Sequence, residues 1–436
     1  MKIVHLSTGD ITGGAFRATY RLHKELQQLG HQSLMLVLNK SSHDGAVVEF
    51  APATDLMSRL RRRLRRERIA RDFARYRASR PPGYEPFSDD RSCYTRELLA
   101  QLPSCDIVNL HWVASYLDYQ TFFSSVPERT PVVWRLADMN AFTGGCHYDD
   151  GCGRFRRECG ECPQLGSMQP NDLSRRVWKR KEAVFNTVDP ARLHLVTLSR
   201  WMADEVQQSP LLGRFALTII PNGIDTEMFS ARDRRTSREL LGIGQNMRVV
   251  LFAANDVTNR RKGLTLLSDA LVGQTTISDL LLVSVGHAKP AVDSRISHLH
   301  LGHFEYKWLS LAYSAADVFV IPSLQENFGN VILESMACGT PVVGFEVGGI
   351  SEMVRPDITG LLVPPYDIPA LRAAVLGLVQ NEEKRRELSR NCRQIVVDEY
   401  SLDLQARRYS ELYKNLLEAK QPSGRLPGPL ESISIC

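Results

Sequence analysis

Two glutamates eight residues apart stand where open α/β sheets bind their ligands. Glu326 lies in a polar loop after the apolar run Val318–Ile321, and Glu334 lies about two turns into the helix expected next. Exposed N–H groups at such a helix N-terminus favour anionic or hydroxyl-rich ligands. A carboxylate can accept paired hydrogen bonds from the vicinal hydroxyls of a sugar or ribose. Two ordinary surface glutamates are the alternative, but the surrounding Glu-Asn-Phe-Gly and Ala-Cys-Gly-Thr-Pro sequences favour a binding site.

A second group of reactive residues is the cysteine set Cys146, Cys152, Cys159 and Cys162, spaced Cys-x5-Cys-x6-Cys-x2-Cys. Four thiolates that end in Cys-x2-Cys can hold a structural zinc ion, and His147 could replace one of them. Free thiols and disulfides are the alternatives, and a reducing compartment disfavours disulfides. Four protein ligands leave no open position on the metal, so we expect an ion that pins a loop and takes no part in catalysis.

Short apolar runs that alternate with helical stretches must position these residues. The runs read as strands are Ile3–Ser7, Ser33–Leu38, Ile107–Leu110, Val132–Leu136, Leu193–Leu198, Leu217–Ile220, Val249–Phe252, Leu281–Val285, Val318–Ile321 and Pro341–Val343. The pattern predicts parallel sheets covered on both faces by helices. A chain of 436 residues is too long for one ordinary core, so two doubly wound halves are expected.

We place the halves at residues 1–198 and 199–395, with a strong turn signal at Pro221-Asn222-Gly223 near the link. A final helix is expected within residues 396–418. The remaining stretch, 419–436, is rich in Pro, Gly and Ser, which predicts disorder.

The whole pattern resembles glycosyltransferase family 4, a family of retaining enzymes with the GT-B fold, in which two Rossmann-like domains face each other across a cleft. The Glu326–Glu334 block resembles the family's E-x7-E signature. Five other segments fit in order, so that the resemblance runs from residue 1 to about 418. They are Gly13-Gly14-Ala15, Pro221-Asn222-Gly223-Ile224-Asp225 with Phe229, Arg261-Lys262-Gly263, Gly348-Gly349-Ile350 with Glu352, and Gly360-Leu361-Leu362-Val363.

The resemblance implies a role for each of these sites. Glu334 would bind the ribose of a nucleotide-sugar donor, and Glu326 would hold the donor sugar together with the backbone of Asn327, Phe328, Gly329 and Asn330. Gly13 and Gly14 would let the backbone approach the diphosphate at a helix N-terminus. Arg261 and Lys262 would supply fixed positive charge to the leaving diphosphate. With this much basic charge, no catalytic metal is expected.

The sequence departs from the family pattern at two places. Many relatives carry a His-Asp pair after the strand at Val132–Leu136, whereas this chain has Ala137-Asp138, so that Asp138 remains at the donor site without the usual His. Relatives also often place an Arg six residues before the lysine, where Asp256 stands here. Arg261 could supply the missing charge.

The implied activity is transfer of a sugar, with retention, from a nucleotide sugar to a glycan or lipid-linked saccharide. The departures keep two alternatives open: a nucleotide-sugar epimerase and a non-catalytic nucleotide-sugar-binding protein of the same fold. Incubation with labelled nucleotide sugar and no acceptor would separate them.

The positive charge of the chain is concentrated in one tract. Residues 59–80 hold eleven arginines and two acids, a net +9 in a chain whose total is +5. A single basic tract on an otherwise mildly acidic chain argues against a nucleic-acid binder. Arg59–Arg80 could rest on anionic lipid or form a solvated helix. Two apolar stripes in and next to it, Leu56, Met57, Leu60 and Leu64 in one and Ile69, Phe73 and Tyr76 in the other, fall on nearly opposite faces, which does not favour a single straight amphipathic helix. Without a secretory signal or a membrane span, the expected location is the cytoplasm, with peripheral contact at the inner face of the membrane as a further option.

Overall fold

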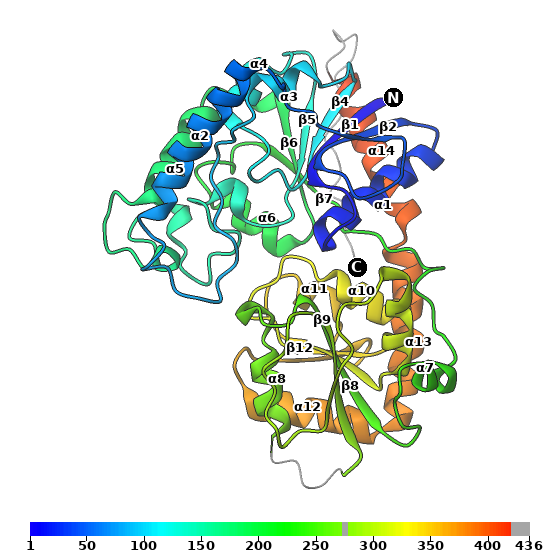
Figure 1. Cartoon of the computed structure of the whole chain (residues 1–436). Coiled ribbons are helices and arrows are strands. Elements are labelled where there is room, and N and C mark those ends of the chain that lie inside the picture. Colours follow the sequence, from blue (N-terminus) through cyan, green and yellow to red (C-terminus); the bar gives the residue numbers. More distant parts are fainter. Residues whose placement is uncertain (273–277, 420–436) are drawn as a thin grey trace.

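Two parallel sheets, each covered by helices, form the two halves of the molecule (Figure 1). The computed structural model describes residues 1–272 and 278–419. The tail that the sequence predicts to be disordered lies, apart from Ala419, outside the described residues.

The first sheet has seven strands in the order β3-β2-β1-β4-β5-β6-β7, all parallel. Its strands are β1 Lys2–Gly9, β2 Gln32–Asn39, β3 Val47–Glu49, β4 Ile107–Leu110, β5 Val132–Arg135, β6 Leu193–Thr197 and β7 Ala216–Ile219. All four residues of β4 and of β5 are buried, as expected for central strands covered on both faces.

The second sheet has six parallel strands in the order β10-β9-β8-β11-β12-β13. They are β8 Arg248–Asp256, β9 Leu280–His287, β10 His298–His300, β11 Val318–Ile321, β12 Val342–Phe345 and β13 Gly360–Val363. Ten of the thirteen strands in the described residues coincide with the predicted apolar runs. The sequence missed β3, β10 and β13, because three or four residues at a sheet edge carry too little apolar pattern to be recognised.

Helices fill the connections and cover the sheets. In the first half they are α1 Gly14–Gln28, α2 Leu56–Ala74, α3 Arg96–Ala100, α4 Tyr119–Ser125, α5 Leu173–Phe185 and α6 Arg200–Gln207. In the second half they are α7 Arg234–Leu240, α8 Leu264–Leu271, α9 Leu309–Ala315, α10 Asn330–Ala337, α11 Ile350–Met353, α12 Ile368–Gln380 and α13 Glu382–Glu399. The last helix, α14 Leu402–Glu418, lies on the first half. None of these described helices has the length and apolar character needed to cross a bilayer.

The division predicted at residues 198 and 199 is wrong by about one βα unit. Helix α6 packs Met202 and Val206 into the core of the first half, and β7 is the last strand of the first sheet. The chain passes to the second half at the Pro221-Asn222-Gly223 turn, and it returns just before α14. The two crossings touch, since the N–H of Ile224 donates to the carbonyl of Tyr400 at 2.8 Å.

The last helix packs against the first half, as predicted. Its residues Tyr409 and Tyr413 are fully buried in a cluster with Ile3, Leu22 and Ile107. Helix α14 therefore fastens the end of the second half to α1 and the first sheet (Figure 1).

The arginine tract forms most of one continuous helix, α2, which has no buried residue. Phe73 and Tyr76, at and just beyond its C-terminal end, pack against a small cluster around Phe87. Its N-terminal half exposes an apolar stripe of Leu56, Met57, Leu60 and Leu64, whose exposed fractions are 79%, 57%, 46% and 58%. The two predicted apolar stripes thus lie in and just beyond one helix. The N-terminal stripe is exposed, whereas Phe73 and Tyr76 of the other stripe pack against the first half.

Candidate active site

The carboxylate of Glu326 lies at the carboxyl end of β11, between the two halves, and is 4% exposed. It accepts hydrogen bonds from Lys262 Nζ at 2.5 Å, from Arg261 Nη1 at 3.2 Å and from the Tyr148 hydroxyl at 3.4 Å. Burial alone would raise its pKa, but Lys262 and Arg261 outweigh burial and lower the pKa of Glu326 to about 2. The carboxylate is therefore charged at any physiological pH.

A tight turn after β8 brings the two basic residues to Glu326. Gly263 ends that turn at φ 75°, and a Cβ there would come within 1.9 Å of the Pro322 carbonyl, so only glycine fits. Arg261 also binds Glu85 at 2.7 Å, and its guanidinium lies 3.9 Å above the Tyr148 ring. Burial opposes the charge on Arg261, but Glu326, Tyr148 and Glu85 raise its pKa above the ordinary value.

The charged form of Lys262 is less strongly favoured than that of Arg261. Burial and the charge of Arg261 lower its pKa, against the opposing effect of Glu326. The predicted pair of fixed charges is thus present, but both members are already engaged by carboxylates. Neither Glu85 nor Tyr148 was predicted from the sequence, because each comes from a loop of the first half with no pattern that marks it.

Glu334 forms a separate part of the site on α10. Its Oε2 accepts from the Tyr313 hydroxyl at 2.9 Å, and its Oε1 lies 3.7 Å from Arg21 Nη2 of α1. Arg17 and Arg21 both lie over the ring of Tyr306, at 4.8 and 4.6 Å from its centroid. Burial raises the pKa of Glu334, and Arg21 opposes this. Helix α1 of the first half therefore reaches, through Arg21, the glutamate of the second half that was expected to bind ribose.

The amide of Asn327 joins the two halves. It is fully buried, donates to the carbonyls of Leu136 and Ala137 at 3.1 Å each, and accepts from the Ser199 hydroxyl at 2.9 Å. Asn327 is thus a structural clamp as well as part of the predicted donor loop.

Asn330, at the start of α10, reaches the glycine loop. Its Nδ2 lies 3.3 Å from the carbonyl of Gly14, and its Oδ1 accepts from Asn222 Nδ2 at 2.9 Å. Gly13, with φ 108°, precedes α1 and has a backbone conformation that suits glycine. The predicted glycine loop and donor loop therefore meet.

Two neighbours of Asn327 serve packing. Phe328 is 8% exposed and packs in the core of the second half beside Tyr400, so its side chain does not line the cleft. Gly329 lies against Ile332, where a Cβ would approach within 3.0 Å. Of the predicted donor residues, Phe328 contributes through its backbone at most.

Asp138 is paired with a histidine, His147, and the sequence did not predict this pairing. His147 Nδ1 lies 2.6 Å from Asp138 Oδ2, and the ring stacks on Trp112 at 5.3 Å. Trp112 Nε1 donates to the same carboxylate oxygen at 2.8 Å. Although Ala137 replaces the usual His, a His from ten residues further along lies beside Asp138. The second ring nitrogen of His147 pairs with Ser88, so neither nitrogen is available to a metal.

The four predicted metal ligands line one small pocket next to this site. All are free thiols. In the part of the chain that the structure describes, no three metal-binding side chains are arranged to hold an ion.

Comparison with known proteins identifies the second half. Residues 247–381 match the family model described as glycosyl transferases group 1. These residues form a glycosyl transferases group 1 domain. The group 1 domain holds Arg261, Lys262, Glu326 and Glu334, whereas the first half supplies Asp138 and Arg21.

Individual relatives agree with this assignment. The chain is 31% identical over 245 residues to a glycogen synthase of Mycobacterium tuberculosis, a match that covers 53% of this chain and 57% of that protein. The chain thus spans little more than half the length of that relative. Its fold is GT-B. Sucrose-phosphate synthase from Thermosynechococcus elongatus superposes with a TM-score of 0.66 at 19% identity, over 96% of this chain and all of the other. Anabaena HepE, solved with UDP and glucose, superposes with a TM-score of 0.64 at 16% identity, over 95% of this chain and 100% of the other.

Proposed function

We propose that the protein is a retaining glycosyltransferase of family 4 that moves a sugar from a nucleotide sugar to a glycan or a lipid-linked saccharide. The observation that carries the proposal is the contact of the buried Glu326 with the partly buried Lys262 and Arg261 between the two halves. Such a group provides a carboxylate for sugar hydroxyls and two cations for a leaving diphosphate within hydrogen-bonding distance of each other.

The reaction follows from what these charges can do. As the bond between the anomeric carbon and the diphosphate breaks, negative charge grows on the phosphate oxygens. Lys262 and Arg261 stabilise that charge, and the N–H groups at the start of α1 add to the effect. An oxygen of the leaving phosphate takes the acceptor's proton, so no side-chain base is required. This arrangement needs no divalent metal.

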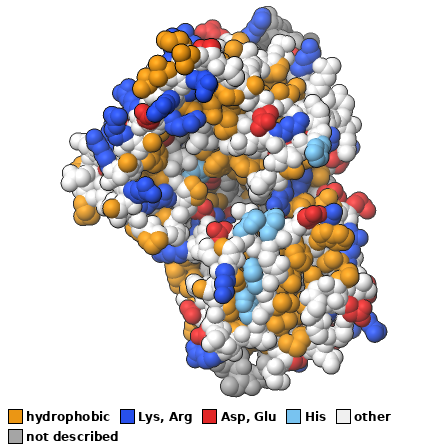
Figure 2. Space-filling view, in the orientation of Figure 1, with side chains coloured by type: hydrophobic (Ala, Val, Ile, Leu, Met, Phe, Trp, Pro, Cys, Tyr) orange, Lys and Arg blue, Asp and Glu red, His pale blue; other side chains and the backbone are white. Residues whose placement is uncertain are grey.

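The acceptor would lie on the first half. A small pocket at the carboxyl ends of β4 and β5 is lined by Trp112, Ala137, Asp138 and His147 among others. Figure 2 shows the surface hollowed between the two halves. Aromatic rings beside a carboxylate and an imidazole suit the mixed apolar and hydroxyl surface of a sugar.

We further propose that α2 holds the enzyme on anionic lipid, near a lipid-linked acceptor. Its exposed stripe of Leu56, Met57, Leu60 and Leu64 is flanked by the exposed arginines Arg59, Arg61 and Arg68. Apolar side chains in the headgroup region and arginines at the lipid phosphates reinforce each other. This favours a peripheral location on a membrane face.

The experiment is incubation with labelled nucleotide sugars, with and without acceptor mixtures. UDP-glucose is the first donor to try, because a protein of the same fold was solved with UDP and glucose. Release of the nucleotide together with a retained anomeric configuration supports the proposal. Epimerised sugar still attached to the nucleotide would make the protein an epimerase. Binding without turnover of any donor, with acceptors present, would make it a binding protein.

A further inference from the structure

Arg135, the last residue of β5, carries a positive charge in the interior and is only 1% exposed. Side chains alternate along a strand, so Arg135 lies on the same side as Val133, which packs toward α1 and α14. Its Nη2 donates to the side-chain oxygen of Asn222 at 2.6 Å. Its Nε and Nη1 have no hydrogen-bond partner among the described residues. The guanidinium is therefore held by one neutral amide.

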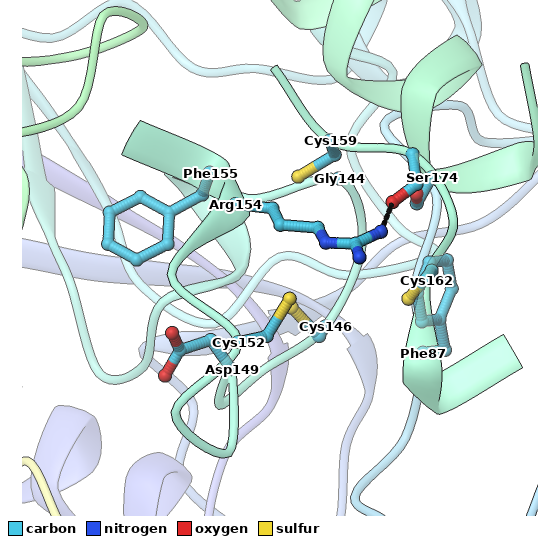
Figure 3. A pocket seen from close by; sticks show the side chains of 11 residues that line it. Phe87, Gly144, Cys146, Asp149, Cys152, Arg154, Phe155, Cys159, Cys162 and Ser174 are labelled. Carbon is cyan, nitrogen blue, oxygen red and sulfur yellow. Dashed lines mark hydrogen bonds between the residues drawn. The ribbon is translucent and has the colours of Figure 1, made fainter. Parts of the chain in front are cut away.

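A second arginine of the first half shows the more usual way to hold such a charge. Arg154 donates to the carbonyl of Gly160 at 2.7 Å, which is the dashed line in Figure 3, and pairs with Glu161 at 3.2 Å. A charge that leaves water without an opposite charge costs free energy. Burial accordingly lowers the pKa of Arg135. The end of β5 thus bears a cost that apolar packing does not require.

The partner of Arg135 lies in the turn where the chain passes between the halves. Asn222 is 2% exposed, and the next residue, Gly223, donates its N–H to the side chain of Gln405 in α14 at 3.0 Å. A guanidinium has donors and no acceptor, so it determines which end of an amide faces it. The oxygen of Asn222 faces Arg135, and its nitrogen therefore faces Asn330.

The same polarity passes on to the glycine loop. Asn222 Nδ2 donates to Asn330 Oδ1 at 2.9 Å, and Asn330 Nδ2 is thereby directed at the carbonyl of Gly14, 3.3 Å away. Arg135 thus sets the direction of two amides in turn. The series begins in the interior and ends at the first residue of α1, where helix N–H groups favour an anion. Since Asn330 is the first residue of α10, two helix N-termini are held together.

We propose that Arg135 is a positioning residue of the donor site, which acts through Asn222 and Asn330 to hold the start of α1 against the start of α10. Arg135 is too deeply buried to touch a donor itself. Its unpaired charge also favours binding of an anion such as a diphosphate at the glycine loop. The role at the donor site rests on the proposed function, whereas the ordering of the two amides does not.

The variant Asn222→Asp separates positioning from packing. Its carboxylate would pair with Arg135 and compensate the buried charge, so the melting temperature should be unchanged or higher. A carboxylate has no donor for Asn330, so the amide of Asn330 would turn its nitrogen to the carboxylate and its oxygen toward the carbonyl of Gly14. The contact with the glycine loop would then be lost. A merely structural role for Arg135 predicts no such loss.

Hydrogen–deuterium exchange of the nucleotide-free protein measures the positioning directly. The amides of residues 17–20, in the first hydrogen-bonded turn of α1, should exchange about tenfold faster in Asn222→Asp and in Arg135→Met. Arg135→Lys keeps a charged donor and should reverse part of this effect. The control is Arg192→Met, which loses a bond to the Val126 carbonyl at the opposite end of the first sheet. Wild-type exchange in Asn222→Asp would overturn the proposal, even if Arg135→Met does not fold.

Titration with UDP tests the consequence for the donor site. We expect Asn222→Asp to bind UDP about tenfold more weakly than the wild type despite its undiminished melting temperature, and Arg192→Met to bind it normally. Faster exchange with unchanged UDP affinity would overturn the role of Arg135 at the donor site. A wild-type protein that binds neither UDP nor any nucleotide sugar would contradict the proposed function itself, and the exchange experiment would still decide whether Arg135 orders the loop.

Discussion

Arg21 of α1 and Glu334 of α10 face each other across the two halves, with 3.7 Å between Nη2 and Oε1 and exposed side-chain fractions of only 11% and 6%. The carboxylate that the resemblance assigns to ribose is thus already paired with a cation from the opposite half. The Tyr313 hydroxyl holds its other oxygen. A donor must therefore share Glu334 with Arg21 or displace it.

This pair predicts a pH dependence of nucleotide binding. Burial raises the pKa of Glu334 and Arg21 lowers it, so Arg21→Gln should raise it further. A protonated carboxyl loses acceptor capacity for ribose hydroxyls, so binding by the variant should weaken as the pH falls, starting at a higher pH than in the wild type. At the acidic end we expect about a tenfold loss, the worth of one hydrogen bond to a charged group.

The measurement is calorimetric titration of nucleotide at several pH values, with Arg407→Gln, an exposed change on α14, as control. A variant with the same pH profile as the wild type would show that Arg21 does not govern Glu334.

His147 predicts a different kind of defect. His147→Phe keeps a ring to stack on Trp112 but removes the hydrogen bonds to Asp138 and Ser88. Sugar transfer should fall about 10- to 100-fold, the cost of about 1.5–3 kcal/mol expected when a buried charged group loses a partner. Donor affinity should change less than the rate of transfer, since His147 lines the pocket in which the acceptor would lie. The matched control is His194→Phe. The imidazole of His194 in β6 is hydrogen-bonded to the hydroxyl of Thr218 in β7. Equal losses in both variants would mean that the effect is general destabilisation.

The apolar stripe of α2 leads to a prediction about membranes. Arg62 and Arg65 must be kept, because they fasten α2 to Glu97 and Asp118. Replacing Arg59, Arg61 and Arg68 by Gln should weaken binding to anionic vesicles about 100-fold, at about 1 kcal/mol per arginine. The control removes the same charge elsewhere, through Gln at the exposed Arg235, Arg386 and Arg407. Sedimentation with vesicles measures both, and equal binding by the two triple variants would contradict a role for α2.

The sequence was sufficient to predict the sheets and the core of the site, for a local reason. The strands of both sheets are short apolar runs, and the loop and helix from Glu326 to Glu334 are contiguous in the chain. The same regularity hid the domain boundary, because α6 and β7 continue the alternation of the first half without any change in pattern.

What the sequence could not reveal depends on how the halves meet. Arg21, Glu85 and Tyr148 each reach the group 1 domain from a distant segment, and nothing near them in the sequence sets them apart. Asp138 was found, but its pairing with His147 was not, since His147 is nine positions further along and a loop brings its imidazole back. Phe328 was assigned to the donor loop on the strength of the motif, although its ring completes a core.

The central claim is that Lys262 and Glu334 serve one donor molecule in different ways, and single-turnover kinetics tests it most directly. Lys262→Ala should raise the barrier to cleavage of bound donor by about 2–4 kcal/mol, with a smaller change in donor affinity. The reason is that the charge of Lys262 matters most as the diphosphate leaves. Glu334→Ala should weaken donor binding and leave the rate of bound donor nearly unchanged, because ribose does not change during reaction. Lys414→Ala, an exposed lysine on α14, should match the wild type in both. Variants of Lys262 and Glu334 that bind and cleave donor like the wild type would contradict the account.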